Sequence, residues 1–218
     1  MAGKVITTHR NLSYVYNRIR QIVYRRVHRF CPRVAWTILP RLSSLIKKDA
    51  VGLEIGAGNS TVWYARRCAR LLSIEHSKLW HVRVLVWLKS EYLDSKVTLF
   101  LAPLEGKNDR SPYLDTLYQI PDDSLDFVVI DGKYRDFVAL GCLSKLKTGG
   151  FLLIDDSHRY LPRREPSSAP FARRESEGYA SALWEKFAIT TTNWEQLWHS
   201  DGVQDTVIYI KPDYWDEN

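Results

Sequence analysis

The first 48 residues of this chain contain no Asp or Glu, although they hold eleven of its 31 Lys and Arg residues. The whole chain has 25 acidic residues and a net charge of +6, so residues 49–218 carry 20 basic against 25 acidic side chains, a net charge of −5. Apolar residues in the basic segment recur at helical spacing as far as Cys31-Pro32, which predicts an amphipathic helix. Such a helix can lie on an anionic membrane, bind nucleic acid or cover its own acidic domain.

Cysteine and long hydrophobic runs are also scarce. The three cysteines, Cys31, Cys68 and Cys142, are too few and too far apart for a disulfide framework or a zinc site. No apolar run approaches the roughly 20 residues of a membrane-spanning helix, and residues 34–39 are too few for the core of a signal peptide. We therefore expect a cytoplasmic protein. Its 218 residues predict a basic helical extension, residues 1–48, and one domain, residues 49–218.

Strand-like and helix-like segments alternate after residue 49, which predicts a doubly wound, Rossmann-like α/β sheet. The expected parallel strands are residues 50–55, 70–75, 96–102, 125–130 and 151–154. The expected helices between and after them are residues 60–70, 79–89, 114–120, 137–147 and 179–187. Two further strands are expected at residues 188–198 and 205–210. Residues 157–178 contain three prolines and are expected to form a functional lid.

The turn after the first expected strand lacks the third glycine of a dinucleotide-binding fingerprint. Gly56 and Gly58 are present, but Thr61 stands at the third position. Glu54 precedes this turn, and its carboxylate would repel the pyrophosphate that such a turn usually binds. The sequence therefore favours a positively charged nucleoside derivative without phosphate.

Glu54, Gly56, Gly58 and Ser60 resemble the first motif of the class I S-adenosylmethionine-dependent methyltransferases. Glu75, which ends the second expected strand, resembles the acid that binds the two ribose hydroxyls in that family. The resemblance extends from about residue 50 to residue 211. It implies S-adenosylmethionine as cofactor and a mixed seven-stranded sheet closed by an antiparallel hairpin. The expected cofactor-binding residues are Glu54, Gly56, Ala57, Gly58, Asn59, Ser60, Glu75, His76 and Asp131.

Two catalytic arrangements remain open. Residues 129–135 and 153–156 resemble the metal-binding segments of catechol-type and caffeoyl-CoA-type O-methyltransferases, which implies Mg²⁺ held by Asp131, Asp155 and Asp156. Asp156 replaces the Asn of that pattern. In the second arrangement His158 is the general base, because the ordinary pKa of histidine suits proton transfer. The candidate catalytic residues are thus His158, Asp131 and Asp155.

The same resemblance, with the absence of an Asn/Asp-Pro-Pro-Tyr motif, implies methyl transfer to a hydroxyl of a small acceptor, with glycan-linked and lipid-linked compounds among the candidates. The Arg pairs at 163–164 and 173–174 favour a negatively charged acceptor. An alternative is an RNA-binding protein or RNA methyltransferase that uses the basic segment as a phosphate clamp. A third possibility is that residues 1–48 bind an anionic membrane surface.

Overall fold

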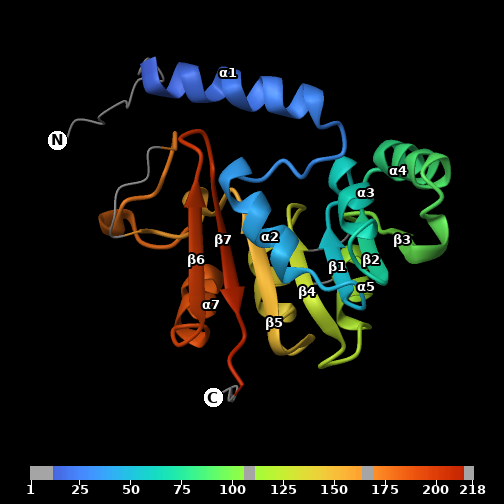
Figure 1. Ribbon diagram of the computed structural model, residues 1–218. Helices are drawn as coiled ribbons and strands as arrows, with labels where there is room; N and C mark the ends of the chain where they lie inside the picture. Colours follow the sequence, from blue (N-terminus) through green and yellow to red (C-terminus); the bar gives the residue numbers. More distant parts are fainter. Residues whose placement is uncertain (1–11, 106–110, 164–168, 214–218) are drawn as a thin grey trace.

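A computed structural model describes residues 12–105, 111–163 and 169–213 (Figure 1). The strands form one sheet in the order β3-β2-β1-β4-β5-β7-β6. Their bounds are β1 Val51–Ile55, β2 Arg70–Glu75, β3 Val97–Leu101, β4 Leu125–Ile130, β5 Leu146–Asp155, β6 Glu195–Ser200 and β7 Asp205–Ile210. Strands β1 to β5 are parallel, and β7 runs antiparallel to both β5 and β6. The predicted doubly wound, Rossmann-like sheet with a closing hairpin is confirmed.

The central strands are almost wholly apolar because helices cover both faces of a parallel sheet. Leu53 of β1 is level with Leu72 of β2 on one side and with Val128 of β4 on the other. Leu53 and Val128 are fully buried. This register brings the carboxyl ends of β1, β2 and β4 to one edge of the sheet, which is where ligands bind in such folds.

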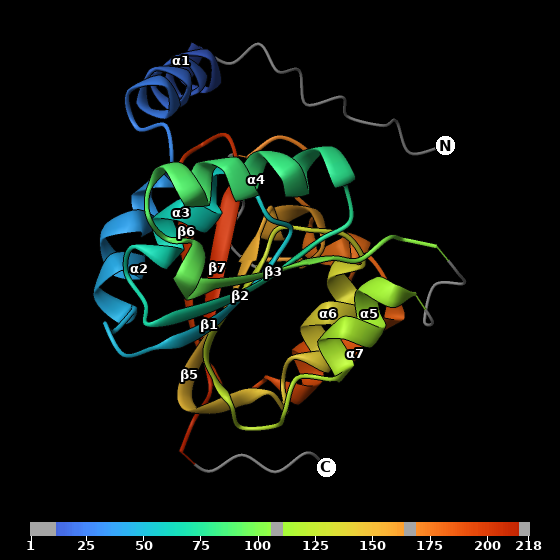
Figure 2. The same cartoon turned by 90° about the vertical axis from the view of Figure 1, so that its right-hand side faces the viewer.

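Two helical layers enclose the sheet (Figure 2). One layer contains α2 Leu39–Leu45, α3 Asn59–Ala65 and α4 Lys78–Ser90, and the other contains α5 Pro112–Tyr118, α6 Arg135–Gly141 and α7 Ala182–Thr190. Ser77, Ser111 and Ser181 cap the amino ends of α4, α5 and α7 with their side chains. Short 3₁₀ turns are η1 Trp36–Ile38, η2 Asp94–Lys96, η3 Ser157–Arg159 and η4 Glu175–Glu177.

Several expected boundaries are wrong: α3 ends at Ala65 although a helix was expected to residue 70, and the ends of α6 and α7 differ as well. Helix α7 continues to Thr190 and β6 starts only at Glu195, although a strand was expected from residue 188. The β-branched residues 189–192 are typical of a strand, which is why one was expected here. In the structure, Ile189 lies on the exposed side of α7. Helix α6 ends at Gly141, and Leu146 already belongs to β5, where an irregular register between β4 and β5 accommodates the extra residues.

Helix α1, Leu12–Val27, lies across the edge of the sheet where the parallel strands end (Figure 1). The chain after it returns to the body, because Ile38 and Leu42 are fully buried in the hydrophobic cluster beside α3. Much of the predicted extension therefore packs as part of the main domain. A division at residue 48 stays a prediction.

The two ends of the expected lid, residues 157–178, are joined to each other by backbone hydrogen bonds. The carbonyl of His158 accepts the N–H of Arg173 at 2.8 Å, and the carbonyl of Tyr160 accepts the N–H of Ala180 at 3.0 Å. Residues 164–168 lie outside the described residues.

Candidate functional site

Glu54 is turned into the protein rather than toward a ligand. Its side chain belongs to a residue only 1% exposed, and Ser60, Thr61 and Ser73 donate hydroxyl hydrogen bonds to it at 2.5, 2.5 and 2.9 Å. Burial raises the pKa of Glu54 to about 7, and the three hydrogen bonds oppose this rise. The carboxylate lies beneath the glycine turn and does not line the cleft, so its contact with a ligand stays a prediction.

The glycine turn between β1 and α3 is closely packed on one side and open on the other. Gly56 has a φ of +96°, and a Cβ there would lie 2.8 Å from the carbonyl oxygen of Asp131. A Cβ on Gly58 would meet nothing closer than Ser60 Oγ at 4.0 Å. The first position therefore needs glycine for packing, whereas the second leaves free space beside the backbone.

An open cleft of about 320 Å³ lies at the carboxyl ends of β1, β2 and β4. It is lined by Arg33, Gly56, Ala57, Gly58, Asn59, Ser60, Glu75, His76, Trp80, Asp131, Gly132, Lys133 and Arg135. The structure thus brings together every expected cofactor-binding residue except Glu54. Three separate stretches of sequence, after β1, β2 and β4, meet there as the alternation of strands and helices predicts.

Glu75 presents a fixed carboxylate at the end of β2. The residue is 3% exposed, its Oε1 accepts the N–H of Ser77 at 2.6 Å, and His76 Nδ1 lies 3.1 Å from the same oxygen. A carboxylate can accept about four hydrogen bonds, so this group retains capacity for ligand hydroxyls. Trp80, in the first turn of α4, adds an aromatic wall to the cleft.

Arg135 forms the centre of the polar contacts after β4. Its Nη2 donates to Asp131 Oδ1 at 2.8 Å, its Nε donates to the Gly132 carbonyl at 3.1 Å, and its Nη1 donates to the Asp155 carbonyl. Burial raises the pKa of Asp131, and the guanidinium of Arg135 opposes the rise. Asp131 is therefore a carboxylate in the cleft whose orientation is set by an ion pair.

The three aspartates proposed as metal ligands are not arranged as a metal site. Asp155 is 4% exposed and its Oδ1 accepts the hydroxyl of Thr206 at 2.9 Å, whereas Asp156 lies 3.8 Å from Arg159 Nη1. Within residues 12–105, 111–163 and 169–213, no group of three His, Cys, Asp or Glu side chains is placed to hold a metal ion. Asp131 has Arg135 as its cationic partner, so the Mg²⁺ prediction finds no support in this geometry.

His158 lies in the interior and does not line the cleft. It is 2% exposed, and its Nδ1 accepts the N–H of Asp205 at 3.1 Å, so the proton of a neutral ring is on Nε2. Burial lowers the pKa of His158. These contacts join η3 to β7, and the role of His158 as general base stays a prediction.

Two arginines of the pairs beyond β5, Arg163 and Arg173, have contacts within the protein. Arg173 donates to the carbonyls of Glu177, Gly178 and Tyr179, which closes the turn around η4. Arg163 lies over the ring of Trp198 at 5.1 Å, and Arg164 falls outside the described residues. The argument from these pairs for an anionic acceptor is thereby weakened.

Five residues that line the cleft were not identified as site residues from the sequence: Arg33, Trp80, Gly132, Lys133 and Arg135. The last four follow strand ends, so the rule that ligands bind at carboxyl ends could have identified them. No local signal identifies Arg33. Its position depends on tertiary contacts, because Arg25 and Gln204 side chains both donate to its carbonyl.

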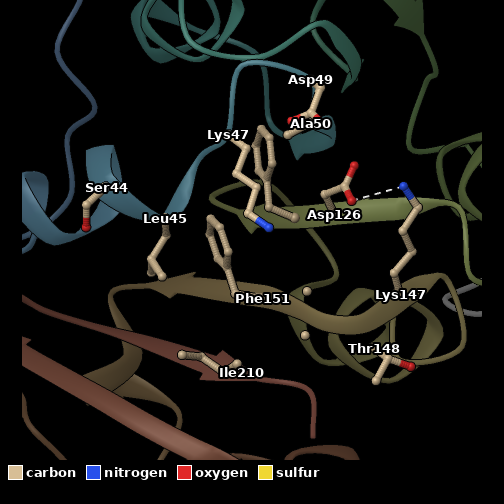
Figure 3. Close-up of a pocket in the computed structure, with 13 residues that line it drawn as sticks. Ser44, Leu45, Lys47, Asp49, Ala50, Asp126, Lys147, Thr148, Phe151 and Ile210 are labelled. Atoms are coloured by element: carbon tan, nitrogen blue, oxygen red, sulfur yellow. Dashed lines mark hydrogen bonds and ion pairs between the residues drawn. The ribbon is translucent and has the colours of Figure 1, made fainter. Parts of the chain in front are cut away.

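A larger cavity, about 370 Å³, lies at the opposite edge of the sheet (Figure 3). Two of its charged side chains, Asp126 and Lys147, are paired within the protein. Lys147 Nζ pairs with Asp126 Oδ1 at 2.9 Å, and Asp126 Oδ2 accepts the N–H of Val51 at 2.7 Å. This cavity contains none of the predicted site residues, so the cleft at the carboxyl ends is the candidate site.

The family model of a methyltransferase domain matches residues 53–157, which extend from within β1 to just past β5 and include most of the residues that line the cleft. No curated protein sequence matches the chain. Solved structures share the fold at low identity. An O-methyltransferase from Bacillus cereus in complex with SAH is 17% identical with a TM-score of 0.57, and 90% of each chain is covered. A putative caffeoyl-CoA O-methyltransferase from Staphylococcus aureus is 14% identical with a TM-score of 0.58, and 93% of each chain is covered.

A methyltransferase from Geobacter sulfurreducens is 12% identical with a TM-score of 0.56, covering 90% of this chain and 89% of that one. These likenesses concern the fold, while the family match concerns the sequence of the segment that builds the cleft. Residues 53–157 thus match a methyltransferase-domain family, and the mixed seven-stranded sheet with a cleft at its carboxyl edge has the fold of these solved methyltransferase structures.

Proposed function

We propose that the cleft binds S-adenosylmethionine and that the enzyme transfers its methyl group to a hydroxyl of a small acceptor. The carboxylate of Glu75, fixed by the Ser77 N–H at the end of β2, carries this proposal. In this proposal it accepts the two ribose hydroxyls, while the open backbone of Gly58 leaves room for close approach of the methionine part. Trp80 and His76 border the space beside Glu75, where an adenine ring would fit.

When bound, S-adenosylmethionine supplies a methyl group that is attached to its positively charged sulfur. This sulfur is the leaving group and becomes a neutral thioether. The protein has to orient the acceptor and remove its proton. Asp131 is the proton acceptor in this proposal, because its carboxylate lines the cleft and burial raises its pKa. Glu75 and the glycine turn would hold the cofactor, which would supply the methyl group, and Asp131 would take the proton of the acceptor hydroxyl. Arg135 holds the carboxylate in place.

The acceptor is a small hydroxyl compound in this proposal, since the segments after β4 and β5 resemble those of small-molecule O-methyltransferases. Arg33 and Lys133 line the cleft and give it positive charge, which favours an acceptor that carries negative charge. The proposal of an anionic acceptor therefore rests on Arg33 and Lys133 rather than on the Arg pairs at 163–164 and 173–174.

Calorimetric titration with S-adenosylhomocysteine tests the cofactor site without requiring the acceptor. We expect the Glu75→Gln variant to bind at least about tenfold more weakly than the parent, because hydrogen bonds to a charged group are lost. Glu185→Gln, on the exposed side of α7, is the matched control and should bind like the parent. Equal affinity of the Glu75→Gln variant, or tighter binding of NAD than of S-adenosylhomocysteine, would contradict the proposal.

A further inference from the structure

Helix α1 turns its polar side toward the protein. Gln21 is 1% exposed, and its Nε2 donates to Asp201 Oδ2 at 3.1 Å in the turn between β6 and β7. One turn further on, Arg25 Nη2 donates to Gln204 Oε1 at 3.1 Å. These hydrogen bonds fix α1 above the carboxyl edge of the sheet (Figure 1).

The opposite side of α1 is apolar and faces outward. Its exposed residues are Leu12, Val15, Tyr16, Ile19, Ile22, Val23 and Val27, with exposed fractions between 43% and 86%. With about 3.6 residues per turn, these positions form one continuous arc centred opposite Gln21. A surface helix normally turns its apolar stripe to the core, so α1 has the reverse orientation. An exposed apolar patch of this kind indicates that a membrane or an apolar surface of another protein covers it.

Basic side chains border the apolar arc. Arg18 lies at one margin and Arg20 at the other, Arg26 lies within the arc near its carboxyl end, and α1 contains no acidic residue. Long arginine side chains at the margins of an apolar stripe can reach a charged interface while their stems stay on apolar surface. This arrangement is typical of a helix that lies in the plane of a membrane surface.

The basic surface continues past the carboxyl end of α1. A cavity of about 680 Å³ adjoins Val27 and is lined by the basic side chains of Arg29, Arg66 and Arg67. Arg66 is paired with Glu91, and the Arg67 guanidinium lies 3.6 Å from the centre of the Trp63 ring. Arginines beside an apolar helix suit the phosphates of lipid headgroups.

We infer that α1 lies flat on an anionic phospholipid surface, with its apolar arc among the acyl chains and Arg18, Arg20 and Arg26 at the level of the phosphates. With 16 residues the helix is about 24 Å long, which suits a position in the interface. In the part of the chain that the structure describes, no helix is long and apolar enough to span a membrane.

Two other occupants fit α1 less well. A second copy of this chain would bring one acid-free arginine helix against another, so like charges would face each other without a neutralising partner. RNA would satisfy the arginines but would leave Leu12, Ile19 and Val23 in contact with water or phosphate. Only a surface with both negative charge and an apolar layer satisfies the arc and its margins together.

This orientation also brings the cleft to the lipid. The Asn59 side chain donates to the carbonyl of Arg29 at 2.8 Å, so the segment after α1 adjoins the glycine turn. Arg33, a few residues further on, lines the cleft. A membrane-bound α1 therefore places the mouth of the cleft on the lipid side of the molecule, where it would meet an acceptor held in the bilayer.

Co-sedimentation of the whole chain with vesicles tests the inference. We expect the protein to pellet with phosphatidylcholine vesicles containing a quarter phosphatidylglycerol and to remain largely in solution with pure phosphatidylcholine. Ile19→Glu and Val23→Glu should each lower the partition coefficient by at least about tenfold, because they place a carboxylate in the apolar arc. Ile189→Glu, which alters an exposed apolar residue of α7, is the control and should partition like the parent.

Circular dichroism and S-adenosylhomocysteine binding show whether each variant is folded, independently of lipid. A parent protein that stays in solution with the anionic vesicles would overturn the inference, as would Ile19→Glu and Val23→Glu variants that pellet as before. A lipid-independent dimer that these two substitutions dissociate would assign the arc to a second copy instead. Salt-sensitive RNA binding lost in an Arg18→Gln, Arg20→Gln double variant, without vesicle binding by the parent, would assign the surface to nucleic acid.

Discussion

Thr61 donates its hydroxyl to Glu54 Oε2 at 2.5 Å and accepts the N–H of Gly58 at 3.0 Å. One side chain thus joins the glycine turn to the buried carboxylate of β1. Thr61 stands at the position where a dinucleotide-binding fingerprint has its third glycine, so its departure from that pattern has a structural reason. The carboxylate and the threonine form one unit that fixes the turn.

Replacing Thr61 by Val should destabilise the protein and weaken cofactor binding. The isosteric side chain leaves the Gly58 N–H without its acceptor and removes one donor from Glu54. We expect a loss of about 1–3 kcal/mol in the free energy of unfolding by urea denaturation. Thr61→Ser keeps the hydroxyl and should recover most of the stability. A Thr61→Val protein as stable as the parent would show that the hydrogen bonds of Thr61 to Gly58 and Glu54 do not contribute to the free energy of unfolding.

Alanine at the two glycines of the turn should have different effects. Gly58→Ala adds a methyl group to open space in the cleft, so we expect near-parental stability with at least about fivefold weaker binding of S-adenosylhomocysteine. Gly56→Ala forces a Cβ to 2.8 Å from the Asp131 carbonyl at a φ of +96°, and it should lower the melting temperature. Denaturation and calorimetry on both variants make the comparison. Parental affinity in Gly58→Ala would mean that the ligand does not approach this backbone.

Stability should fall as the pH rises from about 4.5 to about 7, partly because of Glu54. Its pKa is about 7 in the folded protein against an ordinary 4.5, so the folded state binds more protons in this interval. The stabilisation is complete below pH 4.5, is lost through pH 7, and amounts to at most roughly 3 kcal/mol. The measurement is urea unfolding at pH 5 and pH 8.

Glu54→Gln cannot titrate, so its difference in unfolding free energy between pH 5 and pH 8 should be smaller than that of the parent. Asp131 and Asp155, whose pKa values burial also raises, remain in both proteins and cancel in the comparison. Glu185→Gln serves as the control and should keep the parental pH dependence. The same difference in Glu54→Gln and in the parent would mean that Glu54 has no raised pKa.

Removing divalent ions should leave cofactor binding unchanged. Arg135 supplies the cation beside Asp131, and Thr206 donates to the Asp155 carboxylate, so these groups have partners without a metal. We expect S-adenosylhomocysteine to bind with the same affinity in EDTA and in Mg²⁺, by calorimetry. Arg135→Gln removes the built-in cation and should weaken binding in either condition. Tighter binding of the parent in Mg²⁺ would restore the three-aspartate site.

The alternation of strands and helices and the acids at strand ends could be predicted from the sequence, since both follow from local patterns. The parallel direction of β1 to β5 and the position of Glu75 and Asp131 at the carboxyl edge of the sheet agree with that prediction. The end of α7 was predicted wrongly because β-branched residues on an exposed helical side resemble a strand.

The sequence by itself determined which residues form the parallel strands and the glycine turn, because apolar runs and glycine spacing restrict the chain locally. Only the tertiary structure decided where the side chains point. Glu54 faces inward because three hydroxyls from the turn and from β2 meet it there. Helix α1 turns its apolar side out because its contacts with Asp201 and Gln204, some 180 residues away, hold its polar side. Periodicity reveals that a helix has two sides, but only its distant partners determine which one remains exposed.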